Sequence, residues 1–146
     1  MASPPDMRPR RNADAMKYLL TLWGNEPAWE SLSPEAIAAE MRRWEQIDRE
    51  MTEAGVLVAG EGLEPTASAT TLVIGDDGAT MVDGPFAETK EQLGGFYVLD
   101  CADLDEAIEW ARRIPVDPPG SIEIRPVLDY EAAAAEDDPT GGAAGP

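Results

Sequence analysis

The sequence predicts an α+β protein with a ferredoxin-like sandwich, in which two helices cover one face of an antiparallel sheet. The first observation is the order of the patterned segments, which runs strand, helix, strand, hairpin, strand, helix, strand. The second is the spacing of apolar residues, which changes between strand-like runs and helical steps of three and four residues. Right-handed crossovers make this sandwich the simplest arrangement of those elements.

The first half of the chain is expected to hold a strand and a long helix. Residues 16–23 form an apolar run with aromatic residues, bounded by a Gly-Asn pair, as is typical of a strand. Ser33 is expected to cap the helix, with Pro34 at its first position, and Gly55 to end it in the left-handed conformation. One face of this helix would carry Ile37, Met41, Trp44, Ile47 and Met51.

The second half is expected to hold a hairpin, a strand, a helix and a final strand. Residues 75–78, Gly-Asp-Asp-Gly, have the composition of a hairpin turn. Asp103 is expected to cap the second helix, which Pro115 would end. The buried stripe of that helix would be Leu104, Ala107, Ile108, Ala111 and Ile114. Strands are expected at residues 56–59, 69–74, 79–82, 96–100 and 121–128.

The two ends of the chain are expected to lie outside the folded unit. Residues 1–15 are polar and proline-rich, which predicts a disordered N-terminal extension rather than a secretory signal or membrane span. Residues 131–146 consist mainly of Ala, Gly, Pro and acidic residues and predict a disordered tail. The folded domain is therefore expected over residues 16–130.

Composition excludes several classes of function. The chain has 29 Asp and Glu against 11 Lys and Arg, a formal net charge of −18, so neither nucleic acid nor an anionic membrane is an expected partner. Histidine is absent, so no metal site and no cofactor is expected, and an acid or base would have to be another side chain. Cys101 is the single cysteine, which agrees with a cytoplasmic location.

The predicted sheet is apolar on both faces, although two helices can cover only one of them. Tyr18 and Leu20 alternate with Leu19, and Phe96 and Val98 alternate with further apolar residues. An exposed apolar patch of that size is rare on a soluble monomer, so we expect a homodimer packed sheet to sheet, with a cleft at the boundary. The alternative is that the long segment 60–95 folds back over its own sheet.

The stretch from Asp83 to Phe96, which begins Asp-Gly-Pro-Phe, resembles the DGPF branch of the YCII-related family. Residues 16–19 (MKYL) resemble the opening strand of that family. Residues 54–63 (AGVLVAGEGL) resemble its exit from the first helix, and residues 103–111 (DLDEAIEWA) its second helix. The resemblance covers about Met16 to Val127.

This resemblance implies a ferredoxin-like fold and a dimeric α+β barrel. Some YCII members carry a histidine on the first helix that is thought to work with an aspartate, and one relative is a dechlorinating lyase. That histidine position falls near Trp44 here, so the acid–base pair cannot be carried over. DGPF members tend to be encoded beside extracytoplasmic-function sigma factors, which suggests a regulatory setting.

Asp83 and Lys90 are the candidate catalytic residues. Asp83 would act as the base at the mouth of a cleft, or else accept local backbone hydrogen bonds in a strand-ending turn. Lys90 is one of two lysines and would stabilise an anionic substrate or enolate, or else belong to a solvated run of charge.

Trp44, Phe86, Glu88 and Tyr97 are the candidate substrate-binding residues. Together with Trp23, Trp44 and Tyr97 would form the apolar wall of a pocket, although each of the three also suits a protein core. Tyr97 is in addition a candidate acid. Glu88 belongs to the same charged run as Lys90.

Two functions remain open from the sequence. The first is a cofactor-free enzyme of the lyase or isomerase type, which transfers a proton on a small metabolite in a dimer cleft. The second is a non-catalytic ligand-binding or regulatory protein linked to an extracytoplasmic-function sigma factor, with which it would interact through its acidic surface.

Overall fold

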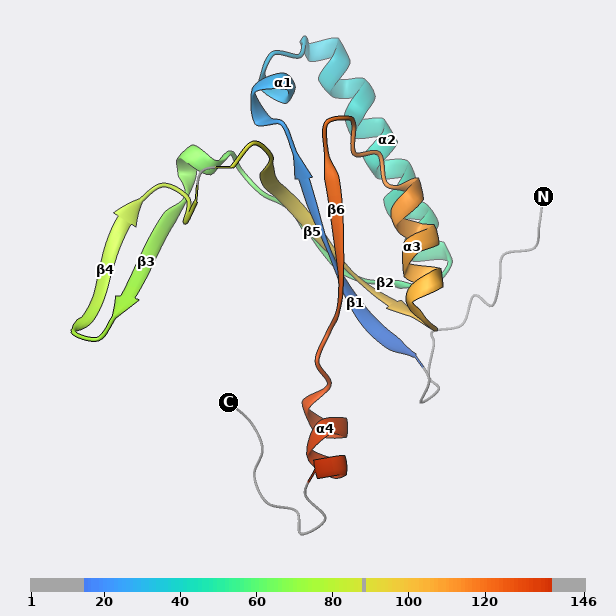
Figure 1. The fold of residues 1–146 in the computed structure, drawn as a ribbon. Coiled ribbons are helices and arrows are strands. Elements are labelled where there is room, and N and C mark those ends of the chain that lie inside the picture. The colour runs from blue at the N-terminus through green and yellow to red at the C-terminus, as the bar shows by residue number, and fades with distance from the viewer. Residues whose placement is uncertain (1–14, 88, 138–146) are drawn as a thin grey trace.

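The protein is built on a four-stranded antiparallel sheet. The computed structural model describes residues 15–87 and 89–137. The strands lie in the order β2-β5-β1-β6, and helices α2 and α3 cover one face of them (Figure 1). This α+β arrangement is compatible with the predicted ferredoxin-like fold. The elements of this layer are β1 (Met16–Gly24), α2 (Pro34–Glu53), β2 (Leu57–Gly62), β5 (Gln92–Cys101), α3 (Leu104–Arg113) and β6 (Ser121–Pro126).

The predicted helix ends are confirmed. The Ser33 hydroxyl accepts a hydrogen bond from the backbone N–H of Ala36 at 3.1 Å, and Pro34 is the first residue of α2. Gly55 follows that helix with φ 75°, the left-handed conformation that glycine adopts without strain. The Asp103 carboxylate caps α3 in the same way as Ser33 caps α2. No helix in the described ranges is long and apolar enough to cross a bilayer.

The hydrophobic core lies between the two helices and the sheet. Trp110 of α3 belongs to it, although it was not expected in the stripe of that helix, and the Arg113 guanidinium lies 4.5 Å from the centre of its ring. Leu104, by contrast, is about half exposed. The core residues are Tyr18, Leu20, Leu22, Ile47, Met51, Ala54, Val56, Tyr97, Leu99, Cys101, Ala107, Trp110, Ala111 and Ile114.

Two helices were not predicted. Helix α1 (Glu26–Glu30) lies between β1 and α2, and the Asn25 side chain caps it by accepting from the Ala28 N–H at 2.8 Å. Helix α4 (Tyr130–Asp137) lies where the sequence predicted disorder; Asp129 caps it and its alanines favour helix. The rest of both predicted disordered ends, residues 1–14 and 138–146, lies outside the described residues.

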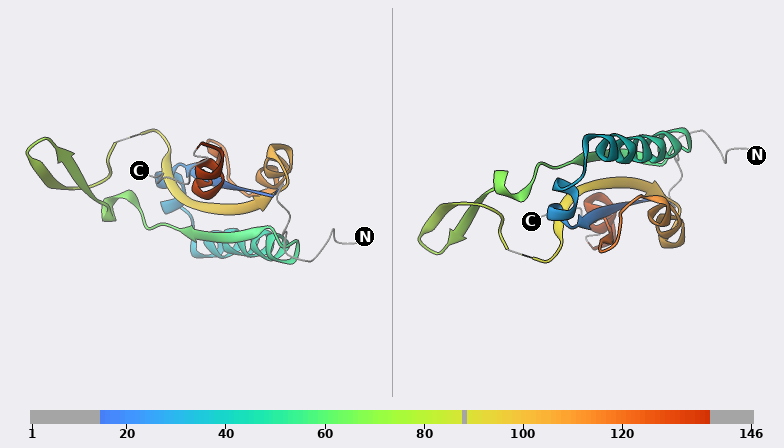
Figure 2. Two further views of the ribbon diagram at one scale, coloured as in Figure 1. Left: turned by 90° about the horizontal axis from the view of Figure 1, so that it is seen from below. Right: turned by 90° about the horizontal axis from the view of Figure 1, so that it is seen from above.

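Strands β3 (Thr70–Gly75) and β4 (Gly78–Asp83) form a separate hairpin, which we call the arm. Within the described part of the chain they pair only with each other, across the predicted turn. A short 3-10 turn, η1 (Thr66–Ser68), precedes the arm. The arm stands away from both the sheet and the helices (Figures 1 and 2), so the segment between β2 and β5 does not fold back over its own sheet.

Close contact between β2 and β5 depends on Gly95. A Cβ at this position would lie 2.8 Å from the carbonyl oxygen of Glu61, which is a backbone atom. Gly95→Ala should therefore lower the free energy of unfolding by about 1–3 kcal/mol, measured by urea denaturation.

Gly94→Ala is the matched control for that variant. Its Cβ would lie at an ordinary 3.9 Å from the carbonyl oxygen of Leu22. Equal stability of the two alanine variants would contradict the tight spacing of β2 and β5.

Candidate functional site

The face of the sheet opposite the helices is the strongest candidate for a functional surface. Side chains alternate along each strand, so the residues between the core positions point away from α2 and α3. We call this surface the open face. It consists of Lys17, Leu19, Thr21 and Trp23 of β1, Ala59 and Glu61 of β2, Phe96, Val98 and Asp100 of β5, and Glu123 and Arg125 of β6.

The open face has an apolar centre and a charged rim. Leu19 of the central strand lies opposite Val98 on one side and Arg125 on the other. Thr21 lies between Phe96 and Glu123 in the same way. The apolar residues of the centre are partly exposed, as the sequence predicted for a sheet with two apolar faces. An apolar centre with a polar rim is the usual composition of a protein interface.

A short chain of hydrogen bonds crosses this face. The Trp23 indole donates from Nε1 to Oγ1 of Thr21 at 2.9 Å, and Thr21 Oγ1 donates to Oε1 of Glu123 at 3.3 Å. The chain orients a carboxylate beside aromatic side chains. The sequence analysis named Trp23 as a candidate for the wall of a pocket but did not single out Glu123, because strand alternation becomes informative only once the covered face is known.

The structure places Asp83, Phe86 and Lys90 at the base of the arm. Asp83 is the last residue of β4 and is exposed, and the next residue, Gly84, has φ 104° and donates its N–H to the carbonyl of Ala69 at 2.7 Å. Phe86 is 90% exposed and Lys90 is also exposed. Glu88 lies outside the described residues. The Phe86 ring is therefore accessible to a ligand or to another molecule.

Tyr97 and Trp44 lie on the other side of the sheet. Tyr97 points towards α2, where its hydroxyl donates a hydrogen bond to the Asp48 carboxylate. Burial and, secondly, this hydrogen bond raise the pKa of the Tyr97 phenol, which therefore stays protonated. Trp44 is partly buried against the core. Within one subunit the structure therefore does not bring these two residues together with Asp83.

The base of the arm is fastened to the body by Glu26 of α1. Its carboxylate accepts from the N–H of Thr66 at 2.7 Å and from the hydroxyl of the same residue at 2.8 Å. Its backbone N–H donates to the Gln92 side chain at 2.9 Å. These bonds join three segments that are far apart in the sequence, so the arm leaves the body in a defined direction. The sequence analysis missed this residue, since α1 itself was not predicted.

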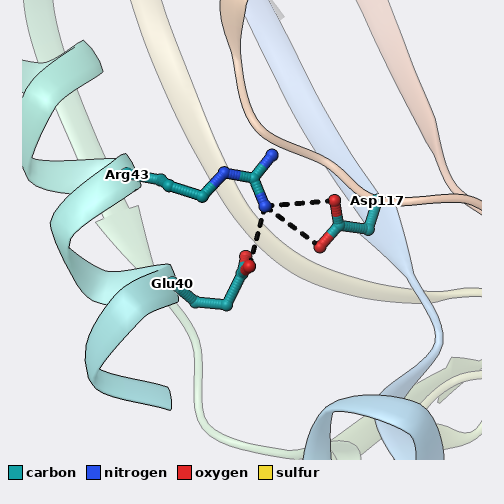
Figure 3. A network of polar contacts seen from close by, with 3 residues as sticks. All are labelled: Glu40, Arg43 and Asp117. Atoms are coloured by element: carbon teal, nitrogen blue, oxygen red, sulfur yellow. Dashed lines mark hydrogen bonds and ion pairs between the residues drawn. The ribbon is translucent and has the colours of Figure 1, made fainter. Parts of the chain in front are cut away.

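A shallow hollow of about 690 Å³ between α2 and α3 is a weaker candidate. Arg43 bonds Glu40 at 2.7 Å and Asp117 at 3.2 Å (Figure 3), which joins α2 to the loop after α3. Arg113 pairs with Glu50 across the two helices. Since Arg43 and Arg113 are already paired with carboxylates, the ion pairs around the hollow serve mainly to hold the helices together. The arginines that line it are Arg42, Arg43, Arg112 and Arg113.

The described residues contain no group of three or more side chains suited to hold a metal ion. The open face and the base of the arm carry carboxylates, aromatic side chains and the cations Lys17, Lys90 and Arg125. These groups can bind an organic molecule, accept a proton from it and stabilise a negative charge on it.

Two comparisons describe the relatives of this chain. The model of the YCII-related domain matches residues 16–131. The chain is also similar to uncharacterized protein R00369 of Rhizobium meliloti (strain 1021), with 41% identity over 118 residues, which cover 80% of this chain and 95% of that protein.

The Tyr97–Asp48 contact predicts a specific dependence of stability on pH. Tyr97→Phe should lower the free energy of unfolding by about 1 kcal/mol near neutral pH, because a partly buried hydrogen bond is lost. A raised pKa in the folded state stabilises the protein below the unfolded value of 10.0, and this contribution is lost as the pH rises further. The difference between wild type and variant, measured by denaturant unfolding, should therefore shrink above pH 10. A difference that stays constant or grows there would contradict this assignment.

Proposed function

This chain belongs to the YCII-related family, and from that premise we propose that it binds a small organic molecule between the open faces of a homodimer. The observation that carries the proposal is the open face itself, with its partly exposed apolar centre. Such a surface is uncommon on a soluble monomer. A second copy is the simplest cover, because a two-fold contact matches one surface with itself and would yield a dimeric α+β barrel.

The charges on the open face favour self-association. The chain as a whole carries a formal charge of −18, which opposes the approach of two copies. The open face differs, because it presents Lys17 and Arg125 beside its carboxylates. In a two-fold contact these cations can meet acidic residues of the other copy, which reduces the repulsion at this face.

The side chains of the open face indicate what kind of ligand would bind there. Trp23 and Phe96 offer flat apolar surface, which suits an aromatic or unsaturated body. Glu123, oriented through Thr21, would accept a hydrogen bond from the ligand. Trp44 and Tyr97 would support the sheet from the helix side in this arrangement, without touching the ligand.

Proton transfer without a cofactor is the reaction that this site would support. Asp83 would be the base, Lys90 would stabilise the enolate or other anion that forms, and Phe86 with Glu88 would border the site. The support lies in the position of Asp83, which shares one side of the arm with Leu72 and Met81.

A non-catalytic, regulatory role is the second candidate. The observation in its favour is the acidic surface, which would attract a basic protein such as a sigma factor at low salt. This role requires no chemical change in a bound ligand. Retention of a partner at low salt, without any turnover of ligand, would favour it over catalysis.

The anionic fluorophore 8-anilinonaphthalene-1-sulfonate tests the proposed site. Trp23→Leu should weaken its binding by about tenfold, because the variant keeps the face apolar but removes the aromatic surface. Trp29→Leu is the control, since Trp29 lies on α1. Fluorescence titration gives the affinity, and sedimentation of both variants confirms that they assemble like wild type. Equal affinities of the two variants would contradict a site at the open face.

Solvent deuterium tests the proposed reaction. A molecule that copurifies with the protein, identified by native mass spectrometry, should take up deuterium from D2O in the presence of wild type. Asp83→Asn should abolish the uptake without releasing the molecule, whereas Asp105→Asn, at an exposed position in the first turn of α3, should leave the uptake unchanged. Uptake that persists in the Asp83 variant would remove Asp83 from the mechanism.

A further inference from the structure

We propose that the arm of each subunit packs against the second copy of the chain and supplies Asp83 to the ligand site on the partner's open face. This inference rests on the proposed homodimer and adds to it. In this arrangement the partner subunit covers the arm, and each ligand site is formed by residues of both subunits. Four features of the described residues support it: the apolar side of the arm, the absence of a covering layer on the arm, the size of the open face and the charges at the tip of the arm.

The arm has one side that is almost wholly apolar. Strand pairing sets Leu72 opposite Met81, and Ile74 opposite Ala79. Side chains of directly paired residues lie on the same side of a hairpin, so these four form one stripe. Ile74 is 79% exposed and Met81 is 74% exposed. An apolar stripe on a projecting hairpin is typical of a contact surface.

A hairpin of this kind does not hold its shape alone. Two isolated strands are marginal in water, and they become stable when a third strand or another layer covers one side. In the described part of the chain no such layer lies on the arm (Figure 2). Its base is nevertheless held firmly by Glu26 and Thr66. A fixed base with an uncovered apolar side indicates a partner that meets the arm in one defined place.

The size of the open face indicates that the sheet alone makes a small interface. Four strands spaced about 4.8 Å apart, each with about six paired residues of about 3.3 Å, have a planar footprint of about 400 Å², and the accessible surface above it is somewhat larger because side chains make it uneven. A stable protein interface removes about 800 Å² of accessible surface from each partner. The arm, about 20 Å long, is the obvious source of the remainder, because it is the other large apolar surface of the described chain.

The charges of the arm fit the open face. The tip consists of Asp76 and Asp77, whereas Lys17 and Arg125 lie at one end of the open face. Acidic tips that reach these cations on the partner would complete a reciprocal contact. An unrelated acidic surface would repel the same tips. Charge complementarity therefore favours a second copy of this chain over a foreign acidic protein as the occupant.

The same strand register sets the side of the arm on which Asp83 lies. It is two residues from Met81 in β4 and opposite Thr70, so its side chain lies on the apolar side of the arm. When that side is covered by the partner, the carboxylate faces the partner's open face. The site is then incomplete in a single subunit, because Asp83 comes from one copy and Trp23 and Glu123 come from the other.

Charged substitutions on the arm test the contact. Met81→Asp should raise the dissociation constant of the dimer by at least about 100-fold, measured by sedimentation equilibrium, because it places a charge in an apolar contact. Ile74→Asp should act in the same direction, and circular dichroism checks the folding of both variants. Met41→Asp is the control, since Met41 is half exposed on α2, away from the arm. Its dimer should be unchanged.

These outcomes separate the inference from the proposed function. If wild type is a monomer, both fail. If Val98→Asp on the open face dissociates the dimer while both arm variants leave it intact, the sheet contact stands and the role of the arm is overturned. If both arm variants weaken the dimer and Met41→Asp does not, the arm contact is supported.

A thiol probe tests the position of Asp83. Cys101 is fully buried, so the thiol introduced by Asp83→Cys would be the one that reacts with an external reagent. Its reaction with 5,5′-dithiobis(2-nitrobenzoate) should be at least about tenfold slower in the dimer than after the additional Met81→Asp change, because the partner covers it. Ala38→Cys, on the exposed side of α2, should react at one rate in both backgrounds. A thiol at position 83 that reacts equally fast in both would overturn the assignment of this residue to the interface.

Discussion

The alternation of apolar side chains along β1 and β5 is the constraint on which the rest of the structure depends. One set of these side chains packs beneath α2 and α3 and forms the core, so the other set must face away from the helices. A shift of one residue in register would exchange the two sets completely. The open face is therefore a direct consequence of the same pattern that builds the core, and the need to cover it follows from the fold.

Local signals allowed most of the fold to be predicted. The caps at Ser33 and Asp103 and the glycine after α2 depend on neighbouring residues alone, and the structure confirms them. Helix α1 was missed because five residues are too few to show helical periodicity; only the cap at Asn25 could have indicated it. Trp110 was missed because the predicted buried stripe of α3 did not include it. The Arg113 guanidinium covers its ring, and the sequence alone does not show this contact.

The candidate site was harder to predict than the fold. The arm lies where it does because Glu26 bonds Thr66, a contact between residues 40 positions apart that no local pattern reveals. Tyr97 was expected either in a pocket wall or in the core, because strand alternation does not say which face the helices will cover. The partner of its hydroxyl, Asp48, comes from the long helix and appears only once that helix is docked. Glu123 was overlooked for the same reason.

The account joins two uncovered apolar surfaces, the open face and the arm, by one symmetric contact. Hydroxyl-radical footprinting of the tryptophans tests this most directly, because it reports which side chains solvent can reach. The account predicts that Trp23 is protected relative to Trp29 when the protein is concentrated, and that dilution below the dissociation constant of the dimer removes the protection. Oxidation of Trp23 at one unchanged rate, whatever the concentration of protein, would contradict it.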